Sequence, residues 1–309
     1  MEFIHYPVMR DEVIEGLNIK PDGIYCDCTL GGGGHTRLIL EKLSDKGRLI
    51  SIDRDIAAIE NAKRNINDNR LMLVKDNYTN IDSIIADSPY ERLDGILMDL
   101  GVSSYQFDNA ERGFSYRYDA PLDMRMDESD LLTAYEVVNS YSEKELAKIL
   151  FDYGEERFGN RIAQRIVRER ETEPIKTTLR LAGIISAAIP VKNRNTDGNP
   201  AKRSFQAIRI EVNAELEGIG QTIEKGVSLL KEGGRIAVIS FHSLEDRIAK
   251  TIFKKLMSPC TCPVDFPVCV CNKKPLVKLI SKKAITPSEK ELSENSRSHS
   301  AKLRIAEKV

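Results

Sequence analysis

The sequence has no apolar run long enough to span a membrane, since a transmembrane helix needs about 18 or more consecutive apolar residues. Residues 1–20 are amphipathic and carry acidic side chains throughout, which excludes a signal peptide. No tract of biased composition occurs, and 41% hydrophobic with 30% charged residues is typical of a globular protein. These absences predict a cytoplasmic protein with no membrane partner, and they favour no particular oligomeric state.

Cysteine is absent except in two short segments. Cys26 and Cys28 alternate along a predicted strand. The other four form one Cys-x-Cys-x6-Cys-x-Cys pattern: Cys260, Cys262, Cys269 and Cys271. Without an export signal we expect a reducing compartment, which argues against a disulfide framework. Four close thiols can hold a structural zinc ion, but Cys-x-Cys is tighter than the usual ligand spacing. We therefore predict no metal, and zinc stays an open alternative to a loop of free thiols.

Four successive glycines, Gly31–Gly34, lack the flanking residues of two common nucleotide-binding loops. No Gly-Lys-Ser/Thr follows them, which excludes a P-loop, and Thr36 stands where a dinucleotide-binding fold has its third glycine. Asp27 precedes them in an Asp-x-x-x-Gly-x-Gly pattern, the usual start of an S-adenosylmethionine (AdoMet) pocket. Asp53 ends the next predicted strand, where a carboxylate can bind ribose hydroxyls. A tight turn with no ligand is the alternative, but the two carboxylates favour a ribose-containing ligand.

Acidic residues close each of four short β-rich segments in the N-terminal third of the chain. They are Asp27, Asp53, Asp76 and Asp99, at the ends of segments 24–28, 49–52, 71–75 and 95–98. Helical patterns lie between these segments, one beginning near Thr36 and one over 56–66. This alternation predicts a doubly wound parallel sheet with carboxylates along one edge.

The strand pattern stops after Leu100 and resumes in the C-terminal third. Residues 231–234 predict a helix end and a turn, and strands are predicted over 235–240, 276–280 and 301–306. The intervening residues carry helical periodicity. We predict one α/β domain, 1–107 and 204–309, interrupted by a helical substrate-recognition insertion over 108–203. Insertions in loops on a sheet edge commonly shape a substrate site.

Basic residues concentrate in the predicted insertion, although the formal net charge of the chain is only −1. Four arginines recur at helical spacing and are predicted to share one helix face. They are Arg157, Arg161, Arg165 and Arg168, and a second basic group comprises Lys192, Arg194, Lys202, Arg203 and Arg209. Such faces bind nucleic-acid phosphates, although a solvated helix face is the alternative for any single run. Two basic groups favour a nucleic-acid partner.

Seven short strings follow one another in the order in which one protein family has them. They are TLGGGGH at 29–35, DLGVSS at 99–104, AERGFS at 110–115, PLDMRMD at 121–127, YGEERF at 153–158, FQAIRI at 205–210 and SFHSLEDR at 240–247. From about His5 to the C-terminus, the chain resembles the RsmH (MraW) family of bacterial 16S rRNA cytosine-N4 methyltransferases. The resemblance implies a Rossmann-like class I AdoMet-dependent α/β sheet with an inserted helical domain. It also implies a cytidine in the decoding region of 16S rRNA, within the small ribosomal subunit, as substrate.

The resemblance assigns the cofactor contacts to seven residues of this chain. They are Gly33, Gly34, His35, Asp53, Tyr78, Asp99 and Gln106. The position of Tyr78 is often Phe in the family, and either ring can cover the adenine. For contacts with RNA we select six basic residues: Arg112, Arg157, Arg161, Arg165, Lys202 and Arg203.

Methylation of cytosine N4 needs a group that improves the amine as a nucleophile, because its lone pair is delocalised into the ring. Many amine methyltransferases use an Asp/Asn-Pro-Pro-Tyr/Phe turn after the fourth strand, but this chain has Asp99-Leu100-Gly101-Val102 there. Asp99 is our candidate catalytic residue. It can accept a hydrogen bond from the amine, from AdoMet or from both, and these roles stay open.

Several other residues near the predicted sheet edge have both a functional and a structural interpretation. His35 can line the cofactor or cap a helix, and His242 can meet the substrate, orient Asp99 or be structural. Three aromatic residues can stack on an unstacked base or belong to the core. They are Phe107, Phe114 and Tyr116.

Three rival functions use the same predicted pocket. The first is a methyltransferase acting on DNA cytosine N4 or on a small molecule. The second is an RNA-binding ribosome-assembly factor with a regulatory AdoMet site. The third is a nicotinamide oxidoreductase, which Thr36 disfavours.

Overall fold

The computed structural model describes residues 7–194, 199–262 and 270–309. The chain divides into two compact units: unit 1 is Met1–Gly101 with Glu217–Val309, and unit 2 is Val102–Leu216. Unit 2 contains the predicted insertion, 108–203, and extends past both of its ends. It takes in helix α5 (Ser104–Asp108) and the whole of α10 (Lys202–Asn213). The reason is packing, since Phe205, Ala207 and Ile208 of α10 lie in the core of unit 2.

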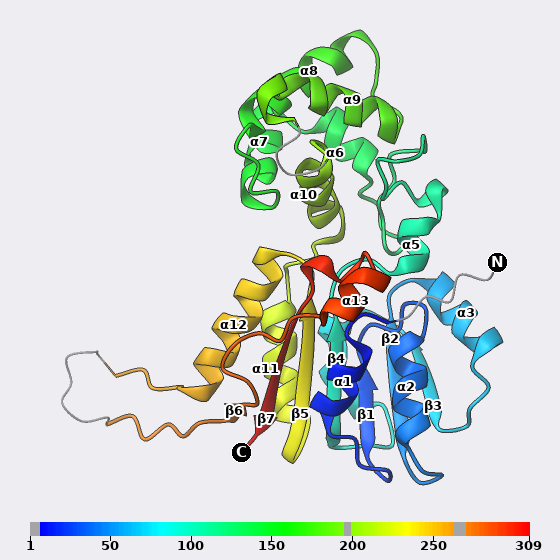
Figure 1. Ribbon diagram of the computed structural model, residues 1–309, viewed down its shortest axis with the longest axis vertical. Helices are drawn as coiled ribbons and strands as arrows, with labels where there is room; N and C mark the ends of the chain where they lie inside the picture. Colours follow the sequence, from blue (N-terminus) through cyan, green and yellow to red (C-terminus); the bar gives the residue numbers. More distant parts are fainter. Residues whose placement is uncertain (1–6, 195–198, 263–269) are drawn as a thin grey trace. The chain divides into compact units, whose positions relative to one another are not determined.

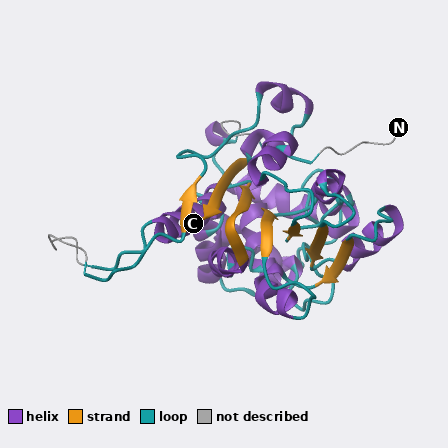
Figure 2. Ribbon diagram, turned by 90° about the horizontal axis from the view of Figure 1, so that it is seen from below, coloured by secondary structure: helices purple, strands orange, loops and turns teal. Residues whose placement is uncertain are grey.

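Unit 1 contains a seven-stranded sheet in the order β3-β2-β1-β4-β5-β7-β6 (Figures 1 and 2). The strands are β1 Ile24–Asp27, β2 Arg48–Asp53, β3 Leu71–Lys75, β4 Leu93–Asp99, β5 Leu230–Ser240, β6 Val277–Leu279 and β7 Lys302–Lys308. Neighbouring strands from β3 to β5 are parallel, and β7 pairs antiparallel with both β5 and β6. The predicted α/β fold, a Rossmann-like class I methyltransferase sheet, is confirmed.

Helices cover both faces of this sheet (Figure 2). Those of unit 1 are α1 Arg10–Leu17, α2 Gly34–Lys42, α3 Ile56–Asn65, α4 Ile81–Ala86, α11 Ile219–Leu229, α12 Ser243–Met257 and α13 Glu289–Glu294, with short 3-10 turns η1 Tyr78–Asn80 and η4 Ser298–Ser300. Apolar residues of α1 and α2 share a core with Leu97 and Ile239. On the other face, Gly226 lets α11 approach Ile96 and Ile236. Alternate residues of the central strands are therefore buried on opposite faces.

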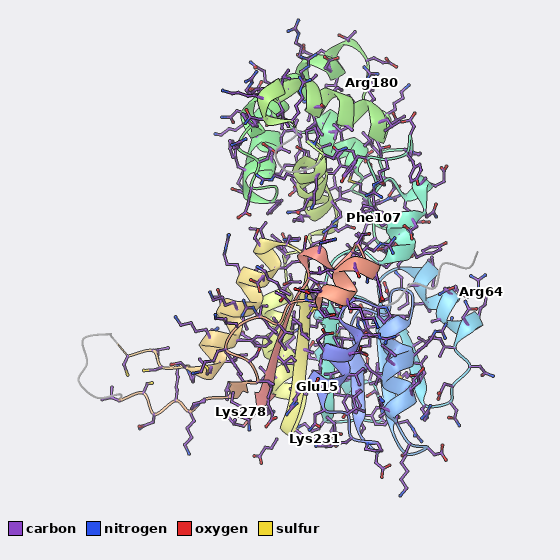
Figure 3. All side chains as sticks on the ribbon, viewed as in Figure 1. Glu15, Arg64, Phe107, Arg180, Lys231 and Lys278 are labelled. Carbon is purple, nitrogen blue, oxygen red and sulfur yellow. The ribbon has the colours of Figure 1, made fainter. Side chains whose placement is uncertain are left out.

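Residues 231–234, predicted to form a turn, belong to β5. The helix α11 ends at Leu229, as predicted, but Leu230 pairs with Leu93 and Arg235 pairs with Gly95. The residues between form a bulge opposite Asp94. Lys231, labelled in Figure 3, lies 2.7 Å from an Asp94 carboxylate oxygen through its Nζ. This ion pair joins two segments distant in sequence at the bulge that contains the Gly-Gly pair.

Unit 2 is mainly helical, in agreement with the predicted periodicity. Besides α5 and α10 it contains α6 Ala134–Ser140, α7 Glu143–Asp152, α8 Gly159–Thr172 and α9 Thr178–Ala188, with 3-10 turns η2 Ala110–Arg112 and η3 Val191–Asn193. Thr133 and Ser142 form capping boxes that fix the starts of α6 and α7. No helix in the described part of the chain is long and apolar enough to cross a membrane.

Candidate active site

Asp27 joins the residues on the two sides of the glycine turn by hydrogen bonds. Its buried carboxylate accepts a 2.7 Å hydrogen bond from Thr36 Oγ1 and a 3.1 Å bond from the Thr29 backbone N–H. Thr36 Oγ1 also lies 2.9 Å from Ser51 Oγ on β2. Burial raises the pKa of Asp27, although these hydrogen bonds lower it. Thr36, which replaces the third glycine of a dinucleotide-binding loop, is therefore the side chain that holds Asp27.

The glycines leave one side of the turn open. Gly33 has φ +77°, and a Cβ there would lie 2.9 Å from Ile66 Cδ1. At Gly32 a Cβ would meet no atom within 4 Å. The helix α2 begins at Gly34, so its first backbone N–H groups have no partners within the helix. An open turn that leads into a helix N-terminus can bind a polar or anionic ligand.

Asp53 lies at the carboxyl end of β2, beside this turn. Its Oδ2 accepts a 2.8 Å hydrogen bond from the Gly31 N–H, and its Oδ1 accepts a 2.9 Å bond from the Asp55 N–H. Burial, together with a smaller effect of the charges of Asp55 and Asp27, raises the pKa of Asp53 to about 6, although the two hydrogen bonds lower it. Each carboxylate oxygen has a second lone pair, which can accept a hydrogen bond from a ribose hydroxyl.

Asp99, half-buried at the carboxyl end of β4, lies beside the buried His35. The Asp99 N–H donates to Thr29 Oγ1 over 2.7 Å, and Asp99 Oδ2 lies 3.6 Å from His35 Nδ1. Asp99 Oδ1 is buried and has no hydrogen-bond partner among the described residues. Burial raises the pKa of Asp99 well above its usual range, and the charges of Asp27 and Glu245 add to the effect. An unpartnered acceptor of this kind can accept a hydrogen bond from a water molecule or from a ligand donor such as an amine.

His35 is a neutral imidazole in this environment. Burial lowers its pKa to about 4, against a smaller opposite effect of its hydrogen bond with the Val8 carbonyl. Because Nε2 lies 3.0 Å from that carbonyl oxygen, Nε2 carries the proton and Nδ1 faces Asp99 as an acceptor. His35 therefore holds the N-terminal segment against α2, and its unprotonated Nδ1 makes no hydrogen bond to the Asp99 carboxylate.

Tyr78 lies at the same sheet edge as Asp53. It begins η1 directly after β3, and Asn77 caps this turn by accepting from the Thr79 N–H over 3.0 Å. The Asp76 N–H donates to the Asp53 carbonyl over 3.0 Å, which ties the ends of β2 and β3 together. The half-buried Tyr78 thus follows the end of β3, next to the end of β2 that carries Asp53.

Gln106 belongs to unit 2, unlike the other predicted cofactor residues. It is the third residue of α5, where its side chain accepts from the Ser103 N–H over 3.0 Å. Its own N–H donates to Ser103 Oγ over 3.2 Å, which completes a capping box. The structure gives Gln106 a helix-capping role, and its contact with the cofactor stays a prediction.

His242 and Glu245 form the start of α12, after β5. Glu245 Oε2 accepts from the Phe241 and His242 N–H groups at 2.7 and 3.2 Å, and His242 Nε2 lies 3.1 Å from Glu245 Oε1. His242 is thus a helix cap, which favours its structural interpretation. Glu245 was not predicted as a site residue, although its buried charge acts on Asp99. The His-x-x-Glu spacing is a capping-box signal, but histidine is not a usual cap.

Comparison with known proteins agrees with this geometry. Residues 2–309 match the MraW methylase family. Two proteins from Clostridium botulinum strains Kyoto and 657, both called ribosomal RNA small subunit methyltransferase H, are 56% identical to the chain over the full length of both sequences. One from Agathobacter rectalis, called ribosomal RNA small subunit methyltransferase H 2, is 54% identical and is covered over 99% of its length. The chain belongs to the MraW methylase family.

As a member of this methylase family, the protein uses AdoMet as its cofactor. The residues of unit 1 fit that molecule: Asp53 can accept from ribose hydroxyls, Tyr78 can cover the adenine, and the open glycine turn can face the methionine part. Asp99 Oδ1 lacks the donor that an amine would supply. When bound, AdoMet supplies a methyl group on a sulfonium, which needs no further activation.

The basic residues selected for RNA differ in how exposed they are. Arg112 is 5% exposed and donates to the carbonyls of Arg125 and Met126 at 2.8 and 2.9 Å. Its guanidinium holds the loop around Met126, which argues against the predicted RNA contact. Arg157 precedes α8 and lies 4.8 Å from the centre of the Phe158 ring, so it is not on the helix face predicted for it.

Three of the four arginines on α8 itself are exposed. They are Arg161, Arg165 and Arg168, and they line a surface cavity of about 610 Å³ together with residues of α7 and α9. Glu143, Glu169 and Glu171 also line it, and Arg165 Nη2 lies 3.2 Å from Glu169. The face is therefore basic along α8 with acidic side chains at its margin.

At the start of α10, Lys202 and Arg203 are exposed, as a nucleic-acid contact requires. Arg203 Nη1 also donates to the Glu155 carbonyl over 3.3 Å. Arg209, counted in the same basic group, is instead paired with Glu215 through two hydrogen bonds of 2.7 and 2.8 Å. The second basic group is thus smaller than the sequence predicts.

The aromatic residues considered for base stacking pack in unit 2. Phe114 is 4% exposed and belongs to its core. Tyr116 meets Phe205 edge to face, with ring centres 5.5 Å apart. Phe107, labelled in Figure 3, is half-buried and packs against the same core. The core interpretation holds for Phe114, and all three rings contribute to packing.

Proposed function

We propose that the protein transfers the methyl group of AdoMet to the exocyclic N4 of one cytidine in the decoding region of 16S rRNA. The acceptor is the small ribosomal subunit in the cytoplasm. Family membership supports methyl transfer, and the names of relatives that are 56% identical support small-subunit rRNA as substrate. The observation that carries the choice of an amine is Asp99 Oδ1, a buried acceptor with no partner among the described residues.

Asp99 acts on the amine in two ways. By accepting a hydrogen bond from an N4 hydrogen, its carboxylate favours a pyramidal nitrogen whose lone pair points at the methyl group. Holding the reacting atoms in line accounts for about 7–11 kcal/mol of barrier reduction in well-oriented systems. Methyl transfer leaves an additional proton on N4. A carboxylate whose pKa lies well above the usual range is a better acceptor for that proton at neutral pH.

His35 lies beside Asp99 but does not hold its carboxylate through a hydrogen bond. Its neutral ring lies on the Oδ2 side of the carboxylate and leaves Oδ1 for the ligand. Asp99 is fixed through its backbone instead, where its N–H donates to Thr29 Oγ1 over 2.7 Å. A fixed acceptor costs little reorganisation when the amine arrives.

Unit 2 supplies the RNA contacts in this proposal. Arg161, Arg165 and Arg168 form one exposed basic row on α8, and Lys202 and Arg203 form a second basic site on α10. Phosphate contacts of this kind orient the RNA and carry no sequence information. The choice of one cytidine therefore has to come from the fit of the extruded base and from the shape of the subunit.

A comparison of three methyl acceptors tests the proposal. AdoMet with a labelled methyl group is incubated with the protein and small subunits that lack the modification, with deproteinised 16S rRNA, or with DNA. We expect label mainly in the assembled subunits, at one cytidine after nuclease mapping. Label only in DNA would support a DNA methyltransferase. AdoMet binding with no transfer to any acceptor would support an assembly factor with a regulatory cofactor site.

A further inference from the structure

Three cysteines gather on the segment between α12 and β6, outside the cofactor site. The described parts of this segment leave the end of α12 and return to β6 away from the sheet (Figure 1). The thiol sulfurs of Cys260, Cys262 and Cys271 all lie within 4.8 Å of one another. Cys269, the fourth cysteine of the sequence pattern, lies outside the described residues.

The distances between these sulfurs suit a metal ion better than a disulfide. Cys260 Sγ and Cys271 Sγ are 3.7 Å apart. A disulfide bond is only about 2.05 Å long. Tetrahedral zinc with Zn–S bonds of about 2.3 Å places its sulfur ligands about 3.8 Å apart. The Val270 N–H donates to Cys262 Sγ over 3.3 Å, as backbone amides do around metal-bound thiolates.

The segment has little else to hold its conformation. Its two stems are joined at the base, where the Leu276 N–H donates to the Leu256 carbonyl over 2.9 Å. Beyond that point, none of the described residues in 257–262 and 270–276 is buried, and Val270 is 65% exposed. Small structures without a hydrophobic core are commonly stabilised by covalent or metal cross-links. Cys260 and Cys271 lie on opposite stems, where such a link is most effective.

We propose that Cys260, Cys262 and Cys271 bind a structural zinc ion that joins the two stems. Thiolates select zinc among the common divalent ions of a reducing compartment. The thiols lose their protons to solvent on binding, so affinity falls at low pH. This site is separate from the AdoMet site, and the proposal does not depend on the proposed function.

Metal content of the full-length protein tests the proposal. The protein is expressed with zinc, purified under reducing conditions without chelator, and analysed by elemental mass spectrometry. We expect about one zinc ion per chain. The triple variant Cys260→Ser, Cys262→Ser, Cys271→Ser should fall to background. The control Thr261→Ala changes an exposed residue between two of the ligands and should retain the metal.

A second measurement separates loss of metal from loss of folding. AdoMet binding of the triple variant should equal that of the unsubstituted protein, because the glycine turn and the acidic strand ends are unchanged. Cobalt added to the reduced unsubstituted protein should give thiolate-to-metal charge-transfer absorption, which the triple variant lacks. The proposal is wrong if the unsubstituted protein holds no zinc, if the triple variant retains it, or if a Cys260–Cys271 disulfide forms in its place.

Discussion

Asp53 links cofactor binding to pH. In the folded protein without ligand its pKa is about 6, because burial and two neighbouring acids disfavour the charged form. In our proposal ribose hydroxyls donate to the carboxylate, so that AdoMet binds the deprotonated form and lowers this pKa. As pH falls below about 6, the free protein takes up a proton that must leave on binding, and affinity decreases.

We therefore predict that the affinity for AdoMet is nearly constant from pH 7 to 8 and falls by up to about tenfold per pH unit below pH 6. Asp53→Asn should weaken binding at pH 7.5 by at least about tenfold and reduce the acidic dependence. Calorimetric titration at several pH values measures both. The pKa of Asp99 is raised as well. If the affinity of Asp53→Asn for AdoMet depends on pH as that of the unsubstituted protein does, the pH dependence is assigned to Asp99.

The glycine turn offers a pair of substitutions with opposite expectations for stability. Gly33→Ala places a side chain at φ +77° and 2.9 Å from Ile66 Cδ1, and should destabilise the fold by about 1–2 kcal/mol or more. Gly32→Ala adds a Cβ that meets no atom within 4 Å, and should change the free energy of unfolding by less than about 0.5 kcal/mol.

Urea denaturation of both variants, without ligand, measures these values. Equal destabilisation by the two substitutions would contradict the conclusion that the turn is open at Gly32. Titration with AdoMet then reports on the ligand itself, since a loss of affinity in Gly32→Ala cannot come from a clash within the protein.

Local spacing predicts the acidic residues of the site because each one ends a strand. Asp27, Asp53 and Asp99 lie where the sequence places them, at one edge of the parallel sheet. The burial of Arg112 and the role of Glu245 depend on contacts that close only in the folded chain. A guanidinium that donates to the backbone of a later loop looks the same in sequence as one that contacts phosphate.

At the scale of elements, α8 is the helix on which the RNA proposal depends. Its three exposed arginines, changed together to glutamate, should weaken binding to small subunits and leave AdoMet binding unchanged. They are Arg161, Arg165 and Arg168. If each contacts a phosphate, the slope of log affinity against log salt should decrease by about 2 to 3. Filter binding over a range of salt concentrations measures this slope.

A control of equal charge lies in unit 1, where Lys42, Lys63 and Arg64 are exposed near the ends of α2 and α3. Arg64 is labelled in Figure 3. Ile66, directly after α3, lies near Gly33 of the glycine turn, so AdoMet binding is measured for this control variant as well. Changing the three residues to glutamate should leave the salt slope almost unchanged. An equal loss in both variants would indicate a general effect of net charge rather than a binding face.

The observed start of α8 explains why the predicted row of four arginines on one helix face is only partly correct. The spacing of Arg157 fits a helix, but α8 begins at Gly159, and the preceding Glu155 has φ +46°. Two glycines in 231–234 are typical of a turn, but in the structure they lie in a bulge, where Lys231 pairs with Asp94. Both differences come from conformations that periodicity does not encode.

At the scale of the whole molecule, the chain places the predicted cofactor residues in unit 1 with the exception of Gln106, and the basic residues selected for RNA contacts in unit 2. The sequence predicts this division through the interruption of the strand pattern. It does not predict that α10 belongs to unit 2, because the amphipathic pattern of a helix does not identify the core that it packs against.

The most direct test of the central claim is methyl transfer by Asp99→Asn at saturating AdoMet, with the modified nucleoside identified by mass spectrometry. We predict that the unsubstituted protein forms N4-methylcytidine at one position of 16S rRNA in the small subunit. The variant should still bind AdoMet, but its transfer rate should fall by about a hundredfold to ten-thousandfold. Transfer at an unchanged rate, or a methyl group on another atom or another nucleic acid, would contradict the account.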